Sequence, residues 1–275
     1  LRFKTDVNGH FMDYDARLAT PPFASLRALE QASLNYERTD AEQSPEYHNW
    51  LRMLYSPGSS LGGARPKANV VDPDGNLWIA KFPSKNDGVD VGAWEYIVTA
   101  MARKFGLRVP ETKIEKFSSD HHTFMTRRFD RRGLTKRLYF ASAMTLLGYR
   151  DGDDAQDGVS YLELAEFLQN YGTSQLKDDL KELWKRVVFN IAISNCDDHL
   201  RNHGFILTSK GWTLSPVYDL TPHPDGLGLK LNISEEDNSL DYHIAIDTAS
   251  FYGIKKEEAE RFVQQARIIC SDWRQ

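Results

Sequence analysis

The stretch from Asn195 to His203 holds the side chains with the most obvious chemistry. Seven of its nine residues carry a carboxylate, an imidazole, a guanidinium or an amide, namely Asn195, Asp197, Asp198, His199, Arg201, Asn202 and His203. Asp197 and Asn202 are five positions apart, as are the base and the metal-binding asparagine in the H-R-D-x-x-x-x-N loop of protein kinases. With Asp219 in "SPVYDL" they could orient an attacking hydroxyl group and hold Mg²⁺ through two oxygen ligands, which is the chemistry of phosphoryl transfer.

Two other interpretations of this cluster stay open from the residues alone. His199 and His203 are four positions apart, so they would share one face of a helix. A carboxylate from Asp197 or Asp219, with His223 as a third nitrogen ligand, would complete a metal site for hydrolysis. The simpler alternative is a solvated loop that caps a helix.

A loop rich in small residues precedes the first predicted strand. In "SSLGGARPK", residues 59–67, the small side chains allow close backbone approach, so consecutive N–H groups could cradle phosphates. The residues that would line this loop are Gly62, Gly63, Ala64, Arg65 and Lys67. The pattern is neither G-x-G-x-x-G nor a Walker loop, and a flexible connection between strands is the alternative.

Lys81 lies within a predicted strand, "LWIAKF", and resembles the strand lysine of kinases that holds the α- and β-phosphates. Glu95, in the predicted helix that follows, could supply its ion-pair partner. The alternative is a lysine on the exposed face of an alternating strand.

The rest of the sequence predicts the elements that hold these groups. Residues 1–55 are expected to be irregular and helical, with a helix entry at Pro21 and Pro22. Strands are predicted, from alternation and from turn signals such as "DPDG", at residues 68–71, 77–82, 112–117 and 122–130, with a hairpin over 205–214. Helices are predicted, from spacing and end signals, at residues 91–105 (closed by Gly106), 136–148, 159–170, 174–194 and 255–272.

The order of these elements favours an α+β fold with two lobes. We expect a small β-rich N-terminal lobe over residues 1–130, with the small-residue loop and Lys81, and a larger helical lobe over residues 131–275, with the polar cluster. A glycine-containing loop, a strand lysine, a helix glutamate, Asp-x4-Asn and a carboxylate after a hairpin is the order of parts in protein kinases. Each of these motifs alone is weak evidence for a kinase, but their occurrence in this order is stronger evidence than any one of them.

Composition limits the other classes of function. The net charge of −5 and the pI near 5.9 argue against a basic nucleic-acid-binding surface over the whole chain. Cys196 and Cys270 are expected to be free thiols in a reducing compartment. No apolar run approaches the ~20 residues of a membrane helix, and no signal peptide opens the chain. We therefore expect a cytoplasmic protein. Because the sequence begins at Leu1 rather than Met, it is either a fragment of a longer protein or a chain without its first residues, and the sequence does not decide between the two.

Several segments together resemble the HipA-like family, the serine/threonine kinase toxins of bacterial type II toxin–antitoxin systems. They are "SSLGGARPKA", "IAKFPS", "FGLRVPETKI", "TRRFDR", "NCDDHLRNHGF" and "LSPVYDLTP". The resemblance covers the whole chain, and the last two segments are its most specific part. It implies a two-lobed, protein-kinase-like fold that uses ATP and Mg²⁺. Family members usually carry a further N-terminal subdomain, which we expect to be missing from this sequence.

The resemblance also implies roles for individual residues. Asp197 would be the catalytic base, and Asn202 and Asp219 would hold Mg²⁺. The residues that would contact the nucleotide are Gly62, Gly63, Ala64, Arg65 and Lys67 in the loop, Lys81 with Glu95, Arg127 and Phe129 of "RRFD", and His199 and Tyr218. Ser60 falls where family members autophosphorylate; a phosphate there would repel the ATP phosphates and stop activity.

The partners implied by the resemblance are a protein substrate and an antitoxin. The antitoxin would be a DNA-binding helix-turn-helix protein, so the chain would reach DNA only indirectly. The family's targets include aminoacyl-tRNA synthetases, and nothing in this sequence selects which. Two rival functions remain: a lipid or small-molecule kinase, since phosphoinositide kinases carry a similar D-x-H-x-x-N loop, and a non-catalytic kinase fold that acts as a co-repressor or binding module.

Overall fold

The computed structural model describes residues 20–54, 65–133 and 136–271. Two compact units make up the chain. The N-terminal unit comprises residues 1–96 and 111–136, and the C-terminal unit comprises residues 97–110 and 137–275. Helix α3 (Val91–Lys104) therefore contributes its first residues to one unit and its remainder to the other.

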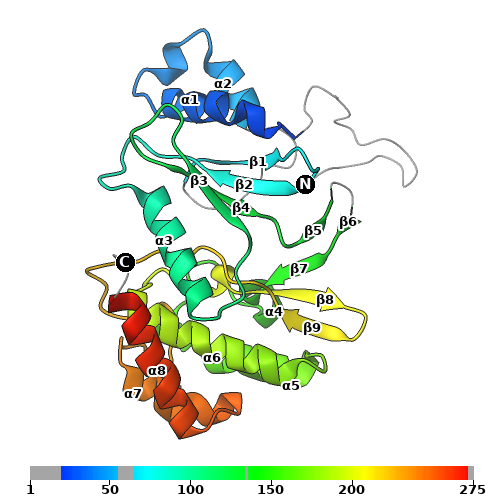
Figure 1. Cartoon of the computed structure of the whole chain (residues 1–275), viewed down its shortest axis with the longest axis vertical. Helices are drawn as coiled ribbons and strands as arrows, with labels where there is room; N and C mark the ends of the chain where they lie inside the picture. Colours follow the sequence, from blue (N-terminus) through cyan, green and yellow to red (C-terminus); the bar gives the residue numbers. More distant parts are fainter. Residues whose placement is uncertain (1–19, 55–64, 134–135, 272–275) are drawn as a thin grey trace. The chain divides into compact units, whose positions relative to one another are not determined.

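The N-terminal unit is built on a four-stranded antiparallel sheet with the order β1-β2-β4-β3 (Figure 1). The strands are β1 (Lys67–Val71), β2 (Leu77–Lys81), β3 (Thr112–Glu115) and β4 (Thr123–Arg127). The "DPDG" turn joins the first two strands, because the Asp72 carboxylate accepts the backbone N–H groups of Asp74 and Asn76.

Within residues 20–54 this unit also has two α-helices, α1 (Leu26–Tyr36) and α2 (Tyr47–Leu54). Leu26 and Leu29 of α1 share a buried apolar cluster with Trp78 of β2. The fully buried Glu30 carboxylate accepts the backbone N–H groups of Ser118 and Ser119 and the hydroxyl group of Thr123. Both apolar and polar contacts therefore hold α1 to the sheet and to the β3–β4 loop.

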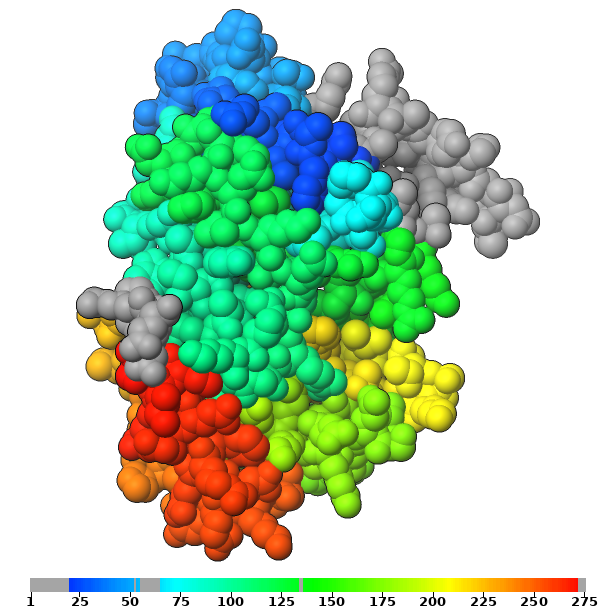
Figure 2. Space-filling view, in the orientation of Figure 1, coloured from blue at the N-terminus to red at the C-terminus, as the bar shows by residue number. Residues whose placement is uncertain are grey.

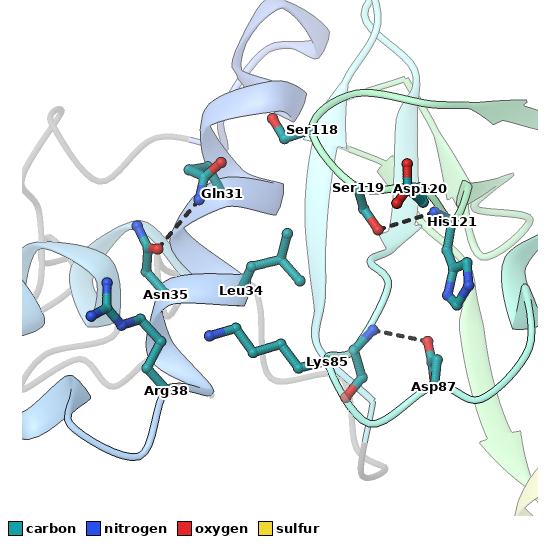
Figure 3. A pocket seen from close by; sticks show the side chains of 11 residues that line it. Gln31, Leu34, Asn35, Arg38, Lys85, Asp87, Ser118, Ser119, Asp120 and His121 are labelled. Carbon is teal, nitrogen blue, oxygen red and sulfur yellow. Dashed lines mark hydrogen bonds between the residues drawn. The ribbon is translucent and has the colours of Figure 1, made fainter.

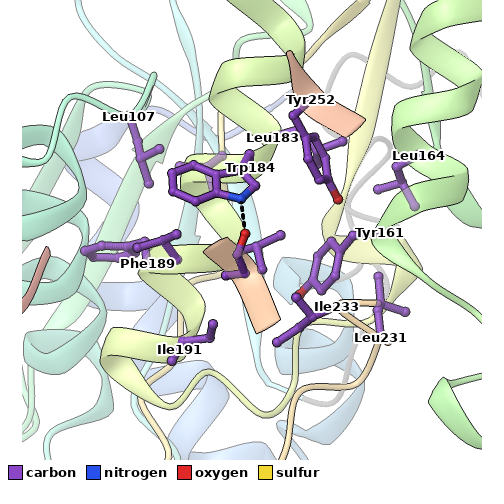
Figure 4. Packing of buried hydrophobic residues seen from close by; sticks show 14 of the residues in the cluster. Leu107, Tyr161, Leu164, Leu183, Trp184, Phe189, Ile191, Leu231, Ile233 and Tyr252 are labelled. Atoms are coloured by element: carbon purple, nitrogen blue, oxygen red, sulfur yellow. Dashed lines mark hydrogen bonds between the residues drawn. The ribbon is translucent and has the colours of Figure 1, made fainter. Parts of the chain in front are cut away.

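The C-terminal unit is mostly helical. Its helices are α4 (Ala143–Leu147), α5 (Tyr161–Tyr171), α6 (Leu176–Ile193), α7 (Tyr242–Thr248) and α8 (Lys256–Ser271). Helix α6 is buried over most of its length, and its Trp184 indole N–H donates to the carbonyl of Ala245 in α7 at 2.7 Å (Figure 4). The α7 and α8 helices lie side by side at the surface of this unit, orange to red in Figure 2. Because α6 is buried and packed against its neighbours, the position of its C-terminal end, from which the next residues continue, is well fixed.

A three-stranded antiparallel sheet with the order β7-β8-β9 completes the C-terminal unit. Its strands are β7 (Tyr139–Ser142), β8 (Gly204–Thr208) and β9 (Gly211–Leu214). The last two form the predicted hairpin.

The predicted helix at residues 136–148 is wrong over its first half. Residues 139–142 form β7, which pairs with β8, and only Ala143–Leu147 are helical. Ser142 sets the boundary because its side chain accepts the backbone N–H of Thr145, as an N-cap residue does. Gly148, in a left-handed conformation, ends α4. Pairing with a strand distant in sequence has overridden the local helical spacing.

The other predicted elements are present with small shifts at their ends, and the mixed α+β class is confirmed. The structure adds α7 and the short strands β5 (Arg131–Arg132) and β6 (Lys136–Arg137), which were not predicted. Gly106 follows α3 in a left-handed conformation, as predicted. Within the described residues, no helix combines the length and apolar character needed to cross a bilayer.

Candidate active site

The polar cluster begins where α6 ends. Ser194 adopts a left-handed conformation with φ of 51° and caps the helix, its N–H donating to carbonyls of the last turn. The preceding residues, from Val187 to Phe189, are buried with at most 1% exposure. The loop that carries Asp197 therefore starts from a rigid anchor.

Asp198 is a buried structural carboxylate. One of its oxygens accepts three hydrogen bonds, from the Tyr161 hydroxyl, the Asn190 amide and Nε2 of His203, the last at 2.9 Å. Burial, and next the charge of Asp198, raise the pKa of Tyr161 well above its usual value, so the phenol stays protonated and donates. These contacts tie the loop to α5 and α6. No role was predicted for Asp198 from the sequence, because its partners Tyr161 and Asn190 belong to other elements.

Asp197 has the opposite environment. Its side chain is exposed, whereas Asp198 is only 3% exposed. The Asn202 amide donates to the Asp197 backbone carbonyl at 3.0 Å, so the two residues of the predicted pair are held together by the loop itself. Of the two adjacent aspartates, only Asp197 presents its carboxylate to an incoming group.

The hairpin β8–β9 returns the chain to this loop. The Tyr218 hydroxyl donates to the backbone carbonyl of Arg201 at 2.7 Å. Burial, and next the Asp219 carboxylate, raise the pKa of Tyr218, which keeps this donor protonated. Asp219 itself has a positive φ of 60°, an uncommon conformation for a residue other than glycine. The structure thus brings Tyr218 and its neighbour Asp219 to the loop of Asn202, although they are far apart in sequence.

The donor atoms of this region suit Mg²⁺ better than zinc. Asn202 and Asp219 offer an amide oxygen and a carboxylate, and Mg²⁺ is typically held by one or two such ligands plus substrate phosphates and water. Nε2 of His203 is bound to Asp198, so only Nδ1 of this ring could reach a metal ion. Across the described residues, no group of three or more His, Cys, Asp and Glu side chains is arranged to hold a metal ion.

In the N-terminal unit, Lys81 and Glu95 form a buried ion pair. The Lys81 ammonium lies 2.5 Å from the Glu95 carboxylate, and their side chains are only 11% and 8% exposed. Lys67 is directly opposite Lys81 in the β1–β2 register, so both lysines lie on one face of the sheet.

The other residues that were predicted to bind the nucleotide differ in their surroundings. The Arg65 guanidinium forms a bidentate pair with Asp87, at 2.7 and 2.9 Å, so its charge is already neutralised. Arg127 is exposed and donates to Asn76 at 2.6 Å. Phe129 is half-buried. Ser60, Gly62, Gly63 and Ala64 lie outside the described residues.

The Lys81–Glu95 pair allows a structural role to be separated from a catalytic one. Glu95→Ala is expected to lower the free energy of unfolding by about 3–5 kcal/mol, because it leaves a buried ammonium group without its partner. The double variant Lys81→Met/Glu95→Leu should recover most of that stability but no nucleotide binding. Denaturant unfolding and calorimetric titration with MgATP measure the two quantities. Wild-type nucleotide affinity in the double variant would exclude a phosphate-binding role for Lys81.

Among the cavities lined by the described residues, two each lie within one unit. One of about 560 Å³ in the N-terminal unit is lined by α1 and by residues 84–87 and 118–121 (Figure 3). It contains none of the predicted site residues. The other, of about 210 Å³ in the C-terminal unit, is lined by both Asp197 and His199. The smaller cavity is therefore the one that adjoins the candidate chemistry.

Comparison with known sequences points to one family. The sequence model of the HipA-like C-terminal domain matches residues 59–273. A protein of Haemophilus influenzae named as a kinase is 27% identical over 208 residues, which is 66% of this chain and 60% of that protein. The serine/threonine-protein kinase toxin HipA of Shewanella oneidensis is 27% identical over 195 residues, 60% of this chain and 43% of HipA. The chain spans less than two-thirds of the length of these relatives.

Solved structures support the same fold. A chain of the complex of HipA, HipB and operator DNA from Shewanella oneidensis matches with a TM-score of 0.63 and 19% identity, over 78% of this chain and 58% of that one. The proinflammatory kinase CtkA of Helicobacter pylori matches with a TM-score of 0.50 and 14% identity, over 76% of this chain and 90% of that one. The fold is therefore kinase-like.

Proposed function

Because the chain belongs to the HipA-like C-terminal domain family, we propose that it is a protein serine/threonine kinase of toxin type that uses ATP and Mg²⁺. The observation that carries this proposal is the buried Lys81–Glu95 pair. A buried ion pair often contributes no more to stability than two apolar residues would, because both charges lose their hydration. A strand lysine that is held by a helix glutamate is the arrangement with which kinases bind the α- and β-phosphates of ATP.

In this proposal each group has one task. Lys81, oriented by Glu95, and Lys67 bind the phosphates, with the loop around Gly62 and Gly63 as backbone donors. Asp197 orients the acceptor hydroxyl group. As the hydroxyl oxygen forms its bond to the γ-phosphorus, the bond from that phosphorus to the β–γ bridging oxygen breaks, ADP leaves, and Asp197 accepts the hydroxyl proton.

Asn202 and Asp219 would hold the metal ion, which when bound neutralises the charge that develops on the phosphates. His199 and Tyr218 would lie beside the nucleotide, with Arg127 and Phe129 nearer the adenine. Most of the rate acceleration would come from positioning and charge neutralisation, because the transition state is loose and needs little covalent chemistry from the protein.

Phosphorylation of Ser60 tests the proposal directly. Incubation with labelled ATP and Mg²⁺, followed by mass spectrometry, is expected to find a phosphate on the peptide that contains Ser60. The same peptide from the Asp197→Ala variant should carry none, which controls for a contaminating kinase. Nucleotide binding without any transfer, to protein or to lipid vesicles, would instead favour the non-catalytic alternative. Transfer to lipid alone would favour a lipid kinase.

The partners in this proposal follow from the same family membership. The solved complex that this chain resembles contains HipA, HipB and operator DNA. We infer that an antitoxin of the helix-turn-helix type restrains this chain and links it to DNA. The protein that it phosphorylates would be a cellular target such as an aminoacyl-tRNA synthetase, and the site of action would be the cytoplasm.

A further inference from the structure

The cavity beside Asp197 has the size of a subsite for one side chain. Its volume is about 210 Å³, below the roughly 300–1,000 Å³ of pockets that hold a complete small-molecule ligand. Met144 and Leu200 supply an apolar part of its lining, and the loop of residues 150–154 supplies much of the polar part. Because Asp197 also lines it, whatever enters this cavity lies next to the proposed catalytic base.

The charges that line the cavity are unequal in number. Four carboxylates, on Asp151, Asp153, Asp154 and Asp197, line it together with three cations, on Arg150, Arg201 and Lys230. Two of the cations already have carboxylate partners: Arg201 pairs with Asp151, and Lys230 lies 3.5 Å from Asp154. Asp153 and Asp197 then remain opposite Arg150 alone. The cavity therefore favours a positive charge over a negative one.

Asp151 is the carboxylate most easily shared with a ligand. Its side chain is 76% exposed, and its Arg201 partner is 42% exposed. An exposed ion pair of this kind contributes little stabilising free energy, so a second cation can replace Arg201 beside Asp151 with only a small loss of free energy. Asp153 and Asp154 are less available, because they accept the backbone N–H groups of Arg150 and Gln156 within the loop.

We propose that this cavity binds a lysine or arginine side chain of the acceptor protein, close in sequence to the hydroxyl group that receives the phosphate. The proposal rests on the proposed kinase function and adds to it a selection rule for the acceptor. The loop of residues 150–154 then acts as a specificity determinant. An acidic or phosphorylated neighbour would be rejected, since it would meet Asp197 and Asp153 at close range.

A peptide library with one fixed serine and randomised flanking positions tests this rule. Wild-type protein should enrich lysine or arginine at one or more positions near the phosphorylated serine. Asp151→Lys should reduce that enrichment about fivefold, the upper range for one exposed pair. The matched control is Glu166→Gln, an exposed carboxylate on α5 outside the cavity. It should leave the enrichment unchanged.

The experiment distinguishes an error in the subsite proposal from an error in the proposed kinase function. Phosphorylation with no basic preference, or with a preference that survives Asp151→Lys, overturns the subsite and leaves the kinase intact. If no peptide is phosphorylated, calorimetric titration with a lysine-flanked and a glutamine-flanked serine peptide still tests the subsite. Tighter binding of the lysine peptide that is lost in Asp151→Lys supports it, and equal binding of the two peptides overturns it.

Discussion

Replacing Asp197 by alanine is expected to lower the rate of phosphoryl transfer by roughly 10²- to 10⁴-fold, the usual contribution of a positioned general base. The free energy of unfolding should change by no more than about 0.5 kcal/mol, because the side chain is exposed. Single-turnover transfer of labelled phosphate and denaturant unfolding measure the two effects. MgATP affinity should stay close to that of the wild type, since Asp197 acts on the acceptor.

Asp197→Asn tests whether the loss of side-chain volume, rather than the loss of the carboxylate, explains the effect of Asp197→Ala. It keeps the size of the side chain but removes its negative charge and its basicity, so it should be nearly as inactive as Asp197→Ala. Wild-type transfer by either variant would show that another group orients the hydroxyl, and the proposed mechanism would then be wrong at its central step.

Replacing the adjacent Asp198 by alanine is expected to have its main effect on stability. The free energy of unfolding should fall by about 3–9 kcal/mol, because three buried donors lose their common acceptor, at about 1–3 kcal/mol for each group left unsatisfied. The loop would also lose its attachment to Tyr161 and Asn190. Transfer should decline as a consequence, even under conditions where the variant is fully folded. Equilibrium unfolding in urea and steady-state assays below the unfolding transition test this prediction.

Asp198→Asn separates charge from hydrogen bonding at the same position. Its amide oxygen can occupy the place of the accepting carboxylate oxygen, so this variant should be more stable than Asp198→Ala. If Asp197→Ala and Asp198→Ala instead gave the same loss of stability and the same loss of rate, the division of roles between the two aspartates would be incorrect.

Local sequence patterns were sufficient for most of the fold. Helix α6, the β8–β9 hairpin and the sheet strand of Lys81 all follow from periodicity and turn residues within their own segments. The strand at residues 139–142 could not be predicted in this way, because it forms by pairing with Gly204–Thr208. The spacing of residues within one segment contains no information about a partner strand that is distant in sequence. Tertiary pairing outweighed helical spacing there.

The candidate site could also be predicted only in part, because contacts between distant segments are not visible in local sequence patterns. The Lys81–Glu95 pair was predicted from the order of a strand and a helix, and the structure contains it. The different environments of Asp197 and Asp198 could not be predicted, because they depend on Tyr161 and Asn190, which belong to other elements. Arg65 likewise was assigned to phosphate binding, whereas its guanidinium is bound to Asp87, 22 positions away.

The buried Glu30 of α1 limits how far the protein can be shortened from its amino end. A truncated version that starts after Tyr36 would leave the N–H groups of Ser118 and Ser119 and the Thr123 hydroxyl without their acceptor. It would also uncover Trp78. The smallest piece that folds independently therefore begins before Leu26, and expression trials or domain grafts that retain only the sheet and the later helices should yield insoluble material.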